Sequence, residues 1–227
     1  MHPLINLVAT RQKSGTPVEL LRWYNDHVSL LMRFDGLVSA TLYRCQQAAL
    51  RGDFPEYICL YRFASPAAFA AFEASPAKEL ARQVTASGWG QRGIEIIQRS
   101  QYPLSGQWTG GVNMSSTATT FHIQCLNLTP APDDAQNDIQ RWLADSLHQT
   151  ANAGANRASL QHYQWLSSAV TDTLQQAVVL ASLSGPALAW QNWWMQHSDQ
   201  SQAWGQPPSM VEVVWQAGYE SLYQWQR

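Results

Sequence analysis

The chain has 227 residues, of which 45% are hydrophobic and 13% are charged, and its formal net charge is −2. This composition allows one large or two small hydrophobic cores and excludes a disordered chain or a coiled coil. The first 110 residues carry 11 Lys and Arg against 8 Asp and Glu, and the remainder carries 3 against 8. Because neither part has a basic cluster, the sequence predicts no nucleic-acid partner.

Targeting and cofactor signals are also missing from the sequence. No apolar run is long enough to span a membrane and no signal peptide is visible, so we expect a cytoplasmic protein with no membrane partner. Cys45, Cys59 and Cys125 lie in strand-like runs without a CxxC spacing, which favours buried, reduced thiols. The histidines lack metal-ligand spacing, and no glycine-rich phosphate loop is present, so the sequence predicts no metal and no other cofactor.

The first half predicts the element order β-α-β-β-α-β. Leu4–Ala9 is a short apolar run that suits a buried strand. Thr16 and Pro17 suit the start of a helix, whose apolar face continues to Phe34 and whose end we place at Gly36. The elements that follow are the strands Leu37–Cys45 and Glu56–Phe63, the helix Ala67–Val84 and the strand Ile94–Arg99.

The second half predicts the same order. Its expected strands are Phe121–Leu128, Ala158–Leu166, Ala177–Leu183 and Met210–Gln216, and its expected helices are Asp134–Thr150 and Pro186–His197.

Short blocks of the first half recur in the second. Arg22-Trp23 returns as Arg141-Trp142, and Tyr102 with Trp108 returns as Tyr219 with Trp225. The matched blocks keep their order at separations of 117 to 120 residues, which predicts a tandem duplication. We therefore expect a first repeat over 1–104, a linker over 105–118 and a degenerate second repeat over 119–227.

This element order predicts an α+β fold of two ferredoxin-like units, each an antiparallel four-stranded sheet with its helices on one face. Strand Tyr57–Tyr61 is apolar on both faces, so the second face of the sheet must be covered as well. Two sheets can cover each other within one chain as a pseudo-dimer, or between chains as a homodimer. We expect the tails around Trp108 and Trp225 to cross to the other repeat or to another chain.

The segment from Trp23 to Leu30 has the pattern W-Y-x-x-H-x-x-L, and a Gly36-Leu37 step follows it. Together with Glu56–Phe69, it resembles the EthD-like branch of the dimeric α/β-barrel superfamily. The resemblance implies that the sheets pair into a barrel, with a pocket between each sheet and its helices. Members include small monooxygenases, lactone isomerases, polyketide-type cyclases and haem-degrading enzymes.

The resemblance points to His27 and Tyr24 as catalytic residues, with His27 as a base or polarising group. The alternative is a core histidine that bonds to a carbonyl or hydroxyl group. The second half has Leu143 and Ser146 at the matching positions, so it lacks this pair. Five further side chains are candidates for substrate binding, although packing can explain each of them: Trp23, Leu31, Tyr43, Tyr61 and Arg62.

Three functions remain open from the sequence. The first is a small-molecule enzyme that acts on an apolar or aromatic compound by cofactor-free oxygenation, isomerisation or cyclisation. The second is a non-catalytic ligand-binding or assembly protein, in which the pocket is a packed core and the tryptophan-rich second half serves association. The third is a haem-binding protein, because some tandem relatives of this fold hold haem through a helix histidine.

Overall fold

The computed structural model describes residues 3–51, 55–110, 120–128, 141–142, 145, 158–164, 167–168, 177–183 and 211–227. The helices within these residues are α1 (Pro17–Leu31), α2 (Pro66–Glu73), α3 (Pro76–Ser87) and α4 (Trp89–Gly93). The strands of the first half are β1 (Leu4–Gln12), β2 (Leu37–Arg51), β3 (Tyr57–Phe63) and β4 (Ile94–Gly110). Those of the second half are β5 (Thr120–Leu128), β6 (Ala158–Gln164), β7 (Ser167–Ser168), β8 (Ala177–Leu183) and β9 (Val211–Gln226).

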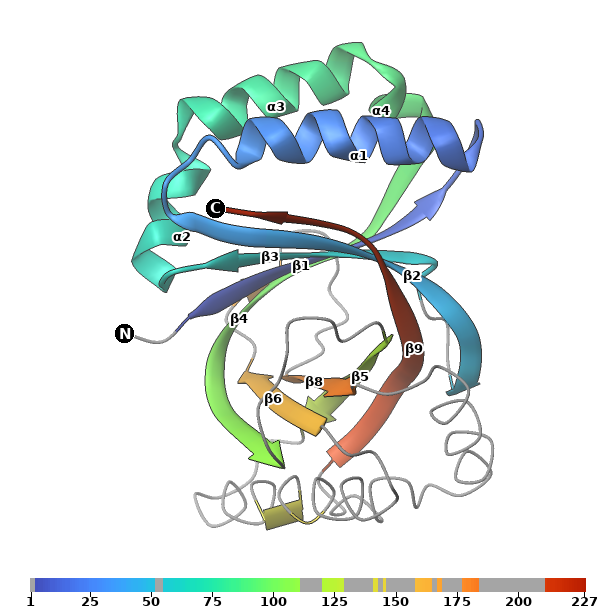
Figure 1. Cartoon of the computed structure of the whole chain (residues 1–227), viewed down its shortest axis with the longest axis vertical. Helices are drawn as coiled ribbons and strands as arrows, with labels where there is room; N and C mark the ends of the chain where they lie inside the picture. The colour runs from blue at the N-terminus through green and yellow to red at the C-terminus, as the bar shows by residue number, and fades with distance from the viewer. Residues whose placement is uncertain are drawn as a thin grey trace.

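The described strands form one antiparallel sheet, and helices pack beside it, so the α+β class is confirmed. The first-half strands lie in the order β4-β1-β3-β2, and the second-half strands lie in the equivalent order β9-β5-β8-β6. Pairing of β2 with β9 and of β4 with β6 joins the two sets. Because β4 also pairs with β1, following the pairings from strand to strand returns to β1. In Figure 1, the helices α1, α3 and α4 lie on one side of the first-half strands, and β5, β6 and β8 lie on the other.

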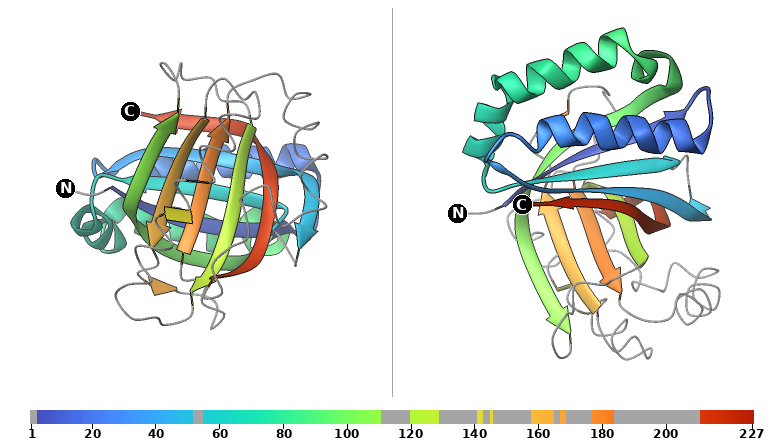
Figure 2. Two further views of the ribbon diagram at one scale, coloured as in Figure 1. Left: turned by 90° about the horizontal axis from the view of Figure 1, so that it is seen from below. Right: turned by 45° about the horizontal axis from the view of Figure 1, so that its top comes forward.

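The prediction that both tails cross to the other half is confirmed. Trp108 on β4 pairs with Leu160 on β6, and Trp225 on β9 pairs with Ala40 on β2. The second view of Figure 2 shows β9 running alongside β2 toward the C-terminus. These pairings also correct two lengths: β4 continues eleven residues past Arg99 to Gly110, and β9 extends to Gln226. Residues 105–110, expected in a linker, therefore lie in a strand, because a distant partner strand supplies their hydrogen bonds.

The helix predictions for the first half need two corrections. Helix α1 ends at Leu31 rather than near Gly36, because the chain tightens there through a bond from Phe34 N–H to the Leu31 carbonyl. Gly36 has no positive φ, and a Cβ atom built on it would lie 2.5 Å from Cε1 of Phe34 and 3.0 Å from the Cβ of Ala68 in α2. This glycine thus permits close approach to α2 instead of capping α1.

The single helix predicted over Ala67–Val84 is two helices. Ser75 caps α3, its hydroxyl accepting a hydrogen bond from the Lys78 N–H at 3.2 Å, and Pro76 occupies the first turn. Proline cannot continue a helix from the preceding residues, so α2 stops at Glu73. The pair Ser75-Pro76 repeats the signal of Ser65-Pro66 at the start of α2, and it marks a helix start in both places.

Both faces of the first-half sheet are buried, as the apolar strands predict. One face carries Leu4 and Leu42 and packs against α1 and α2 in the main core. The opposite face carries Ile5, Leu7 and Ile58, each at most 1% exposed. We call the first the helix-side face and the second the inner face.

Several predictions fall outside the described residues. They include the whole of the helix at Pro186–His197 and most of that at Asp134–Thr150, of which only residues 141, 142 and 145 are described. Leu143, Ser146 and the side chain of Cys125 are also outside. No helix among the described residues is long and apolar enough to cross a membrane.

Candidate functional site

A cavity of about 450 Å³ lies between the helix-side face and the helices α1 and α3. Five of the predicted site residues line it: Trp23, Tyr24, His27, Leu31 and Tyr61. Apolar side chains from β1 and β4, such as Val8, Ile94 and Ile96, make much of the remaining wall. The volume falls within the range of small-molecule pockets, roughly 300–1,000 Å³.

Helix α1 carries the central group of this cavity, and its start is well defined by the sequence. Thr16 and Glu19 form a capping box: Thr16 Oγ1 accepts from the Glu19 N–H, and Glu19 Oε2 accepts from the Thr16 N–H at 2.8 Å. These hydrogen bonds from Thr16 also lower the pKa of the Glu19 carboxyl. The helix buries Tyr24 and Val28 in the core, which turns His27 toward α3.

Trp23 and His27 stand one helical turn apart and stack on each other. Their ring centroids are 4.8 Å apart with an interplanar angle of 17°. Behind Trp23 lies Gly90, where a Cβ atom would come within 2.3 Å of the indole Nε1. Because any larger residue at Gly90 would displace the indole, α4 fixes the position of Trp23, and Trp23 covers one face of the imidazole.

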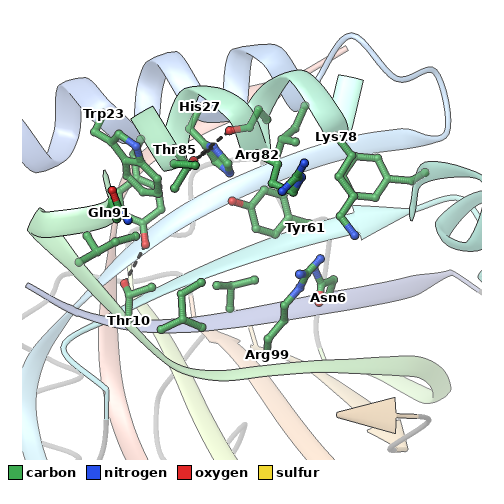
Figure 3. A pocket seen from close by; sticks show the side chains of 18 residues that line it. Asn6, Thr10, Trp23, His27, Tyr61, Lys78, Arg82, Thr85, Gln91 and Arg99 are labelled. Carbon is green, nitrogen blue, oxygen red and sulfur yellow. Dashed lines mark hydrogen bonds between the residues drawn. The ribbon is translucent and has the colours of Figure 1, made fainter. Parts of the chain in front are cut away.

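The hydrogen bonds of His27 determine its tautomer. Its Nδ1 lies 3.0 Å from Thr85 Oγ1, and the Thr85 hydroxyl donates to the Ala81 carbonyl at 2.9 Å. A threonine hydroxyl has one hydrogen, and here that hydrogen is directed at Ala81. With that hydrogen on the Ala81 carbonyl, the Nδ1–H is the donor toward Thr85, and the lone pair lies on Nε2. Figure 3 shows His27 hanging from α1 toward Tyr61 and the sheet.

Burial sets the charge of His27. It lowers the pKa of the imidazole to about 4, the cation of Arg99 lowers it further, and the Ala81 carbonyl works in the opposite direction. His27 is consequently neutral at pH 7. A neutral imidazole whose Nδ1–H is engaged presents Nε2 as a hydrogen-bond or proton acceptor.

The two tyrosines of the cavity differ in their partners. The Tyr24 hydroxyl is 2.7 Å from Thr10 Oγ1, and burial raises the pKa of Tyr24 well above its ordinary value. Burial likewise raises the pKa of Tyr61, which lies near Cys59. Both phenols therefore stay protonated at neutral pH and can act only as hydrogen-bonding groups.

Three cations line one end of the cavity: Lys78, Arg82 and Arg99. Arg99 reaches it because of a β-bulge in β4. Thr10 pairs with Ile96 but Ala9 pairs with Gln98, so Ile97 is the extra residue, and every later side chain changes face. Arg99 thereby lies opposite Val8 on the helix-side face instead of on the inner face.

Tyr43 and Arg62 do not line the cavity. Tyr43 lies opposite Ile58, and Arg62 lies opposite Ile5, so both are on the inner face. Strand alternation explains this placement, since Arg62 follows Tyr61 directly and successive side chains point to opposite faces. The prediction that these two side chains share a pocket with His27 is therefore wrong.

Sequence reasoning missed Thr85, Arg99 and Asn6 at this cavity. Thr85 and Arg99 gave no local signal, because a helix-to-helix contact and a bulge bring them to the site. Asn6 did give one: it is the single amide in the apolar run Leu4–Ala9. Its side chain is 3% exposed, lines the cavity, and has an Oδ1 without a hydrogen-bond partner within the described part of the chain.

Among the described residues, no group of three or more His, Cys, Asp or Glu side chains is arranged to hold a metal ion.

No protein-family model matches the chain, and no curated protein matches it. Solved structures do. An anthrone oxidase-like protein matches with a TM-score of 0.63 at 14% identity, covering 99% of this chain and 93% of that one. A candidate monooxygenase from Fusobacterium nucleatum subsp. nucleatum matches at 0.60 and 10% identity, covering 100% and 95%.

A mutant chlorite dismutase from Candidatus Nitrospira defluvii, in complex with cyanide, matches with a TM-score of 0.57 at 5% identity, covering 97% of this chain and 91% of that one. These proteins are members of the ferredoxin-like, dimeric α/β-barrel fold, and the likeness extends over nearly the full length of the chain. At such low identity, the likeness establishes the fold and leaves the function to the site.

Proposed function

We propose that this chain is a small-molecule enzyme that binds an apolar, aromatic compound beside His27 and uses this residue as a base or polarising group. The observation that carries the proposal is the chain of hydrogen bonds from His27 through Thr85 to Ala81, which leaves Nε2 as the acceptor. A packed-core histidine would have both nitrogens satisfied. Here the contact with Thr85 engages Nδ1 rather than Nε2, and the ring lines a cavity.

The reaction we propose begins with a proton of the substrate, on a phenolic oxygen or on a carbon next to a carbonyl group. His27 Nε2 accepts this proton or polarises the bond that holds it. The resulting anion can then isomerise, cyclise or, with dioxygen as the co-substrate, be oxygenated. Tyr24 and Tyr61, held protonated by burial, position the substrate, and Trp23 and Leu31 contact its apolar surface.

We also propose the finer features of the family resemblance. In this view the first half is an EthD-like repeat and the second half is a degenerate copy, with the two sheets pairing into one barrel as an intramolecular pseudo-dimer. The equivalent strand orders β4-β1-β3-β2 and β9-β5-β8-β6 support it. The boundary between the copies then lies beyond Gly110, where β4 ends. We further propose the cytoplasm as the compartment, with which the free, buried thiol of Cys59 accords.

A fluorescence titration with two matched probes tests the proposal. We expect 2-naphthol to bind more tightly than 2-methoxynaphthalene, because only the first can donate a hydrogen bond to His27 Nε2. The variant His27→Ala should lose the difference between the probes, whereas Asp26→Ala, on the exposed side of the same helix, should keep it. A difference that persists in His27→Ala would contradict the assignment of Nε2.

Turnover is tested separately. Compounds from a phenol and quinone panel that bind are assayed by absorbance and by oxygen consumption. The variant Thr85→Val should lower kcat, because it removes the acceptor that sets the tautomer, and Thr85→Ser should restore it. Binding without any turnover would favour the alternative of a ligand-binding protein. The cavity already argues against the version of that alternative in which the pocket is filled by packed side chains.

Haem is a second candidate that rests on the same atom. A histidine that donates through one ring nitrogen commonly ligates a metal through the other, and His27 has that arrangement. The cavity volume favours a compound of two to four rings over a porphyrin macrocycle. Titration with haemin decides: a Soret shift that saturates at one equivalent and disappears in His27→Ala would support haem and overturn the first proposal.

A further inference from the structure

The cavity has two chemically different ends. Figure 3 shows Trp23, Gln91 and Thr10 at one end and Lys78, Asn6 and Arg99 at the other, with His27 and Tyr61 between them. Among the described residues that line it, three side chains are cationic and none is a carboxylate. An apolar ligand alone would gain nothing from such a cluster, since desolvating cations costs free energy.

The carboxylates that neutralise these cations lie outside the cavity. Glu73 pairs with both Lys78 and Arg99, the latter at 3.1 Å, and Glu79 pairs with Arg82 at 2.8 Å. Among the described residues, these ion pairs bring three cationic side chains against two carboxylates. The bond to Glu73 uses only part of the donor capacity of Lys78, because an ammonium has three donors.

Asn6 supplies an independent sign of a polar ligand at this end. It is 3% exposed and lines the cavity, and its Oδ1 makes no hydrogen bond in the described part of the chain. An unpartnered buried amide oxygen is unfavourable, and because it is an acceptor it calls for a donor on the ligand, while the NH2 group of the same amide is the part that suits a carboxylate. Its NH2 group can donate to a carboxylate and its oxygen can accept from a hydroxyl.

The β-bulge at Ile97 brings Arg99 to the same end. Without the extra residue, Arg99 would lie on the inner face, and Gln98 would take its place on the helix-side face. Bulges often re-aim a side chain next to a functional site. Arg99, Asn6 and Lys78 come from β4, β1 and α3, so three separate elements build this end of the cavity.

We propose that the ligand is an aromatic carboxylic acid, with its rings beside Trp23, His27 and Tyr61 and its carboxylate held by Lys78, Arg99 and Asn6. This inference rests on the proposed function and names the substrate class of the same site. It has a consequence for the base. A bound carboxylate offsets the Arg99 charge, which otherwise lowers the pKa of His27, so the substrate itself makes His27 a better proton acceptor.

Isothermal titration calorimetry with 2-naphthoate and 2-naphthamide at pH 7.5 tests the proposal, because the two probes share their shape and differ in charge. For the wild type, we expect 2-naphthoate to bind about tenfold more tightly or better, as charge-assisted hydrogen bonds are worth more than neutral ones. Arg99→Gln and Lys78→Gln should each weaken 2-naphthoate several-fold and leave 2-naphthamide unchanged. Arg33→Gln, an exposed cation on the chain after α1, is the matched control and should change neither.

The possible results distinguish failure of the carboxylate site from failure of the proposed function. Equal affinity of the wild type for both probes would overturn the acid site and leave the aromatic pocket intact. Failure of both probes to bind would overturn both proposals. An effect of Arg33→Gln as large as that of Arg99→Gln would mean general attraction to a charged surface and would also overturn the site. Should Arg99→Gln fail to fold by circular dichroism, Lys78→Gln and the two probes on wild type still decide.

Discussion

The two faces of the first-half sheet differ in whether their buried amide side chains are hydrogen-bonded. On the inner face, Gln98 is 6% exposed and its amide donates to Ser100 Oγ at 3.2 Å and to the Tyr102 hydroxyl at 3.1 Å. On the helix-side face, Asn6 is equally buried and its Oδ1 makes no hydrogen bond within the described residues. The buried amide of the inner face is thus hydrogen-bonded, whereas the buried amide of the helix-side face has an oxygen that is not.

This difference distinguishes a face whose polar groups serve the fold from the face at which we propose a ligand. Buried polar groups are almost always hydrogen-bonded, so the pairing on the inner face is the ordinary case. Asn6 Oδ1 and Trp23 Nε1 are exceptions among the described residues, and both residues line the cavity. These two unpaired groups therefore lie at the site that we propose for a ligand, and they point to it independently of any likeness to other proteins.

Removing a ring from the inner face should have the largest effect. Tyr102 is fully buried, and truncation of a buried aromatic residue to alanine costs about 3–5 kcal/mol. We expect Tyr102→Ala to lower the free energy of unfolding by about that amount in urea denaturation. The matched change on the other face is Ala86→Leu, which places its side chain in the cavity and should cost far less. Similar losses for the two variants would mean that the faces are packed alike.

Acid should destabilise the fold through the helix-side face. The pKa of His27 is about 4 in the folded protein, below the ordinary value of 6.5. The unfolded chain therefore binds the proton first, and stability decreases as the pH falls from about 6.5 to 4. The full shift corresponds to about 3 kcal/mol, at 1.36 kcal/mol per pKa unit.

Urea denaturation of the wild type and of His27→Gln across this pH range checks the acid effect. Glutamine does not titrate, so the variant should lose most of the decline between pH 6.5 and 4. If both proteins decline in parallel, the acid sensitivity comes from other groups, and the burial of His27 does not control it.

The sequence predicts this sheet well and the cavity only in part. Alternation, caps and turn residues depend on neighbours in the chain, so all eight predicted strands occur and Thr16 caps its helix as expected. The helix break at Pro76 was predictable in principle, because Ser75-Pro76 repeats an earlier signal. The ends of β4 and β9 were not, since distant strands stabilise them.

For the site, the resemblance led to His27 and Tyr24, and the residue pattern added Trp23, Leu31 and Tyr61. The structure brings these five together around one cavity. Tyr43 and Arg62 failed because their face depends on strand register, which composition does not determine. Arg99 could not be found at all, because a single bulged residue decides on which face of β4 it lies. Whether any of these residues binds a substrate is still a prediction.

Two leucine substitutions give the smallest and sharpest test of the comparison. Gln98→Leu removes two hydrogen bonds from the inner face and should lower the free energy of unfolding by about 1–2 kcal/mol. Asn6→Leu removes an amide with an unpaired oxygen from the other face and should leave stability unchanged or raise it by up to about 1 kcal/mol.

The decisive result is the sign of each change in the free energy of unfolding. The comparison is direct, because the two substitutions are nearly the same and both sites lie in neighbouring strands of one sheet. A group retained at a cost in stability must serve something that the free protein does not contain, whereas a group whose loss weakens the fold needs no further explanation. Chemical denaturation gives both values. If Asn6→Leu destabilised the protein as much as Gln98→Leu does, Asn6 would be a structural residue, and the case for a polar ligand at that end of the cavity would rest on the cations alone.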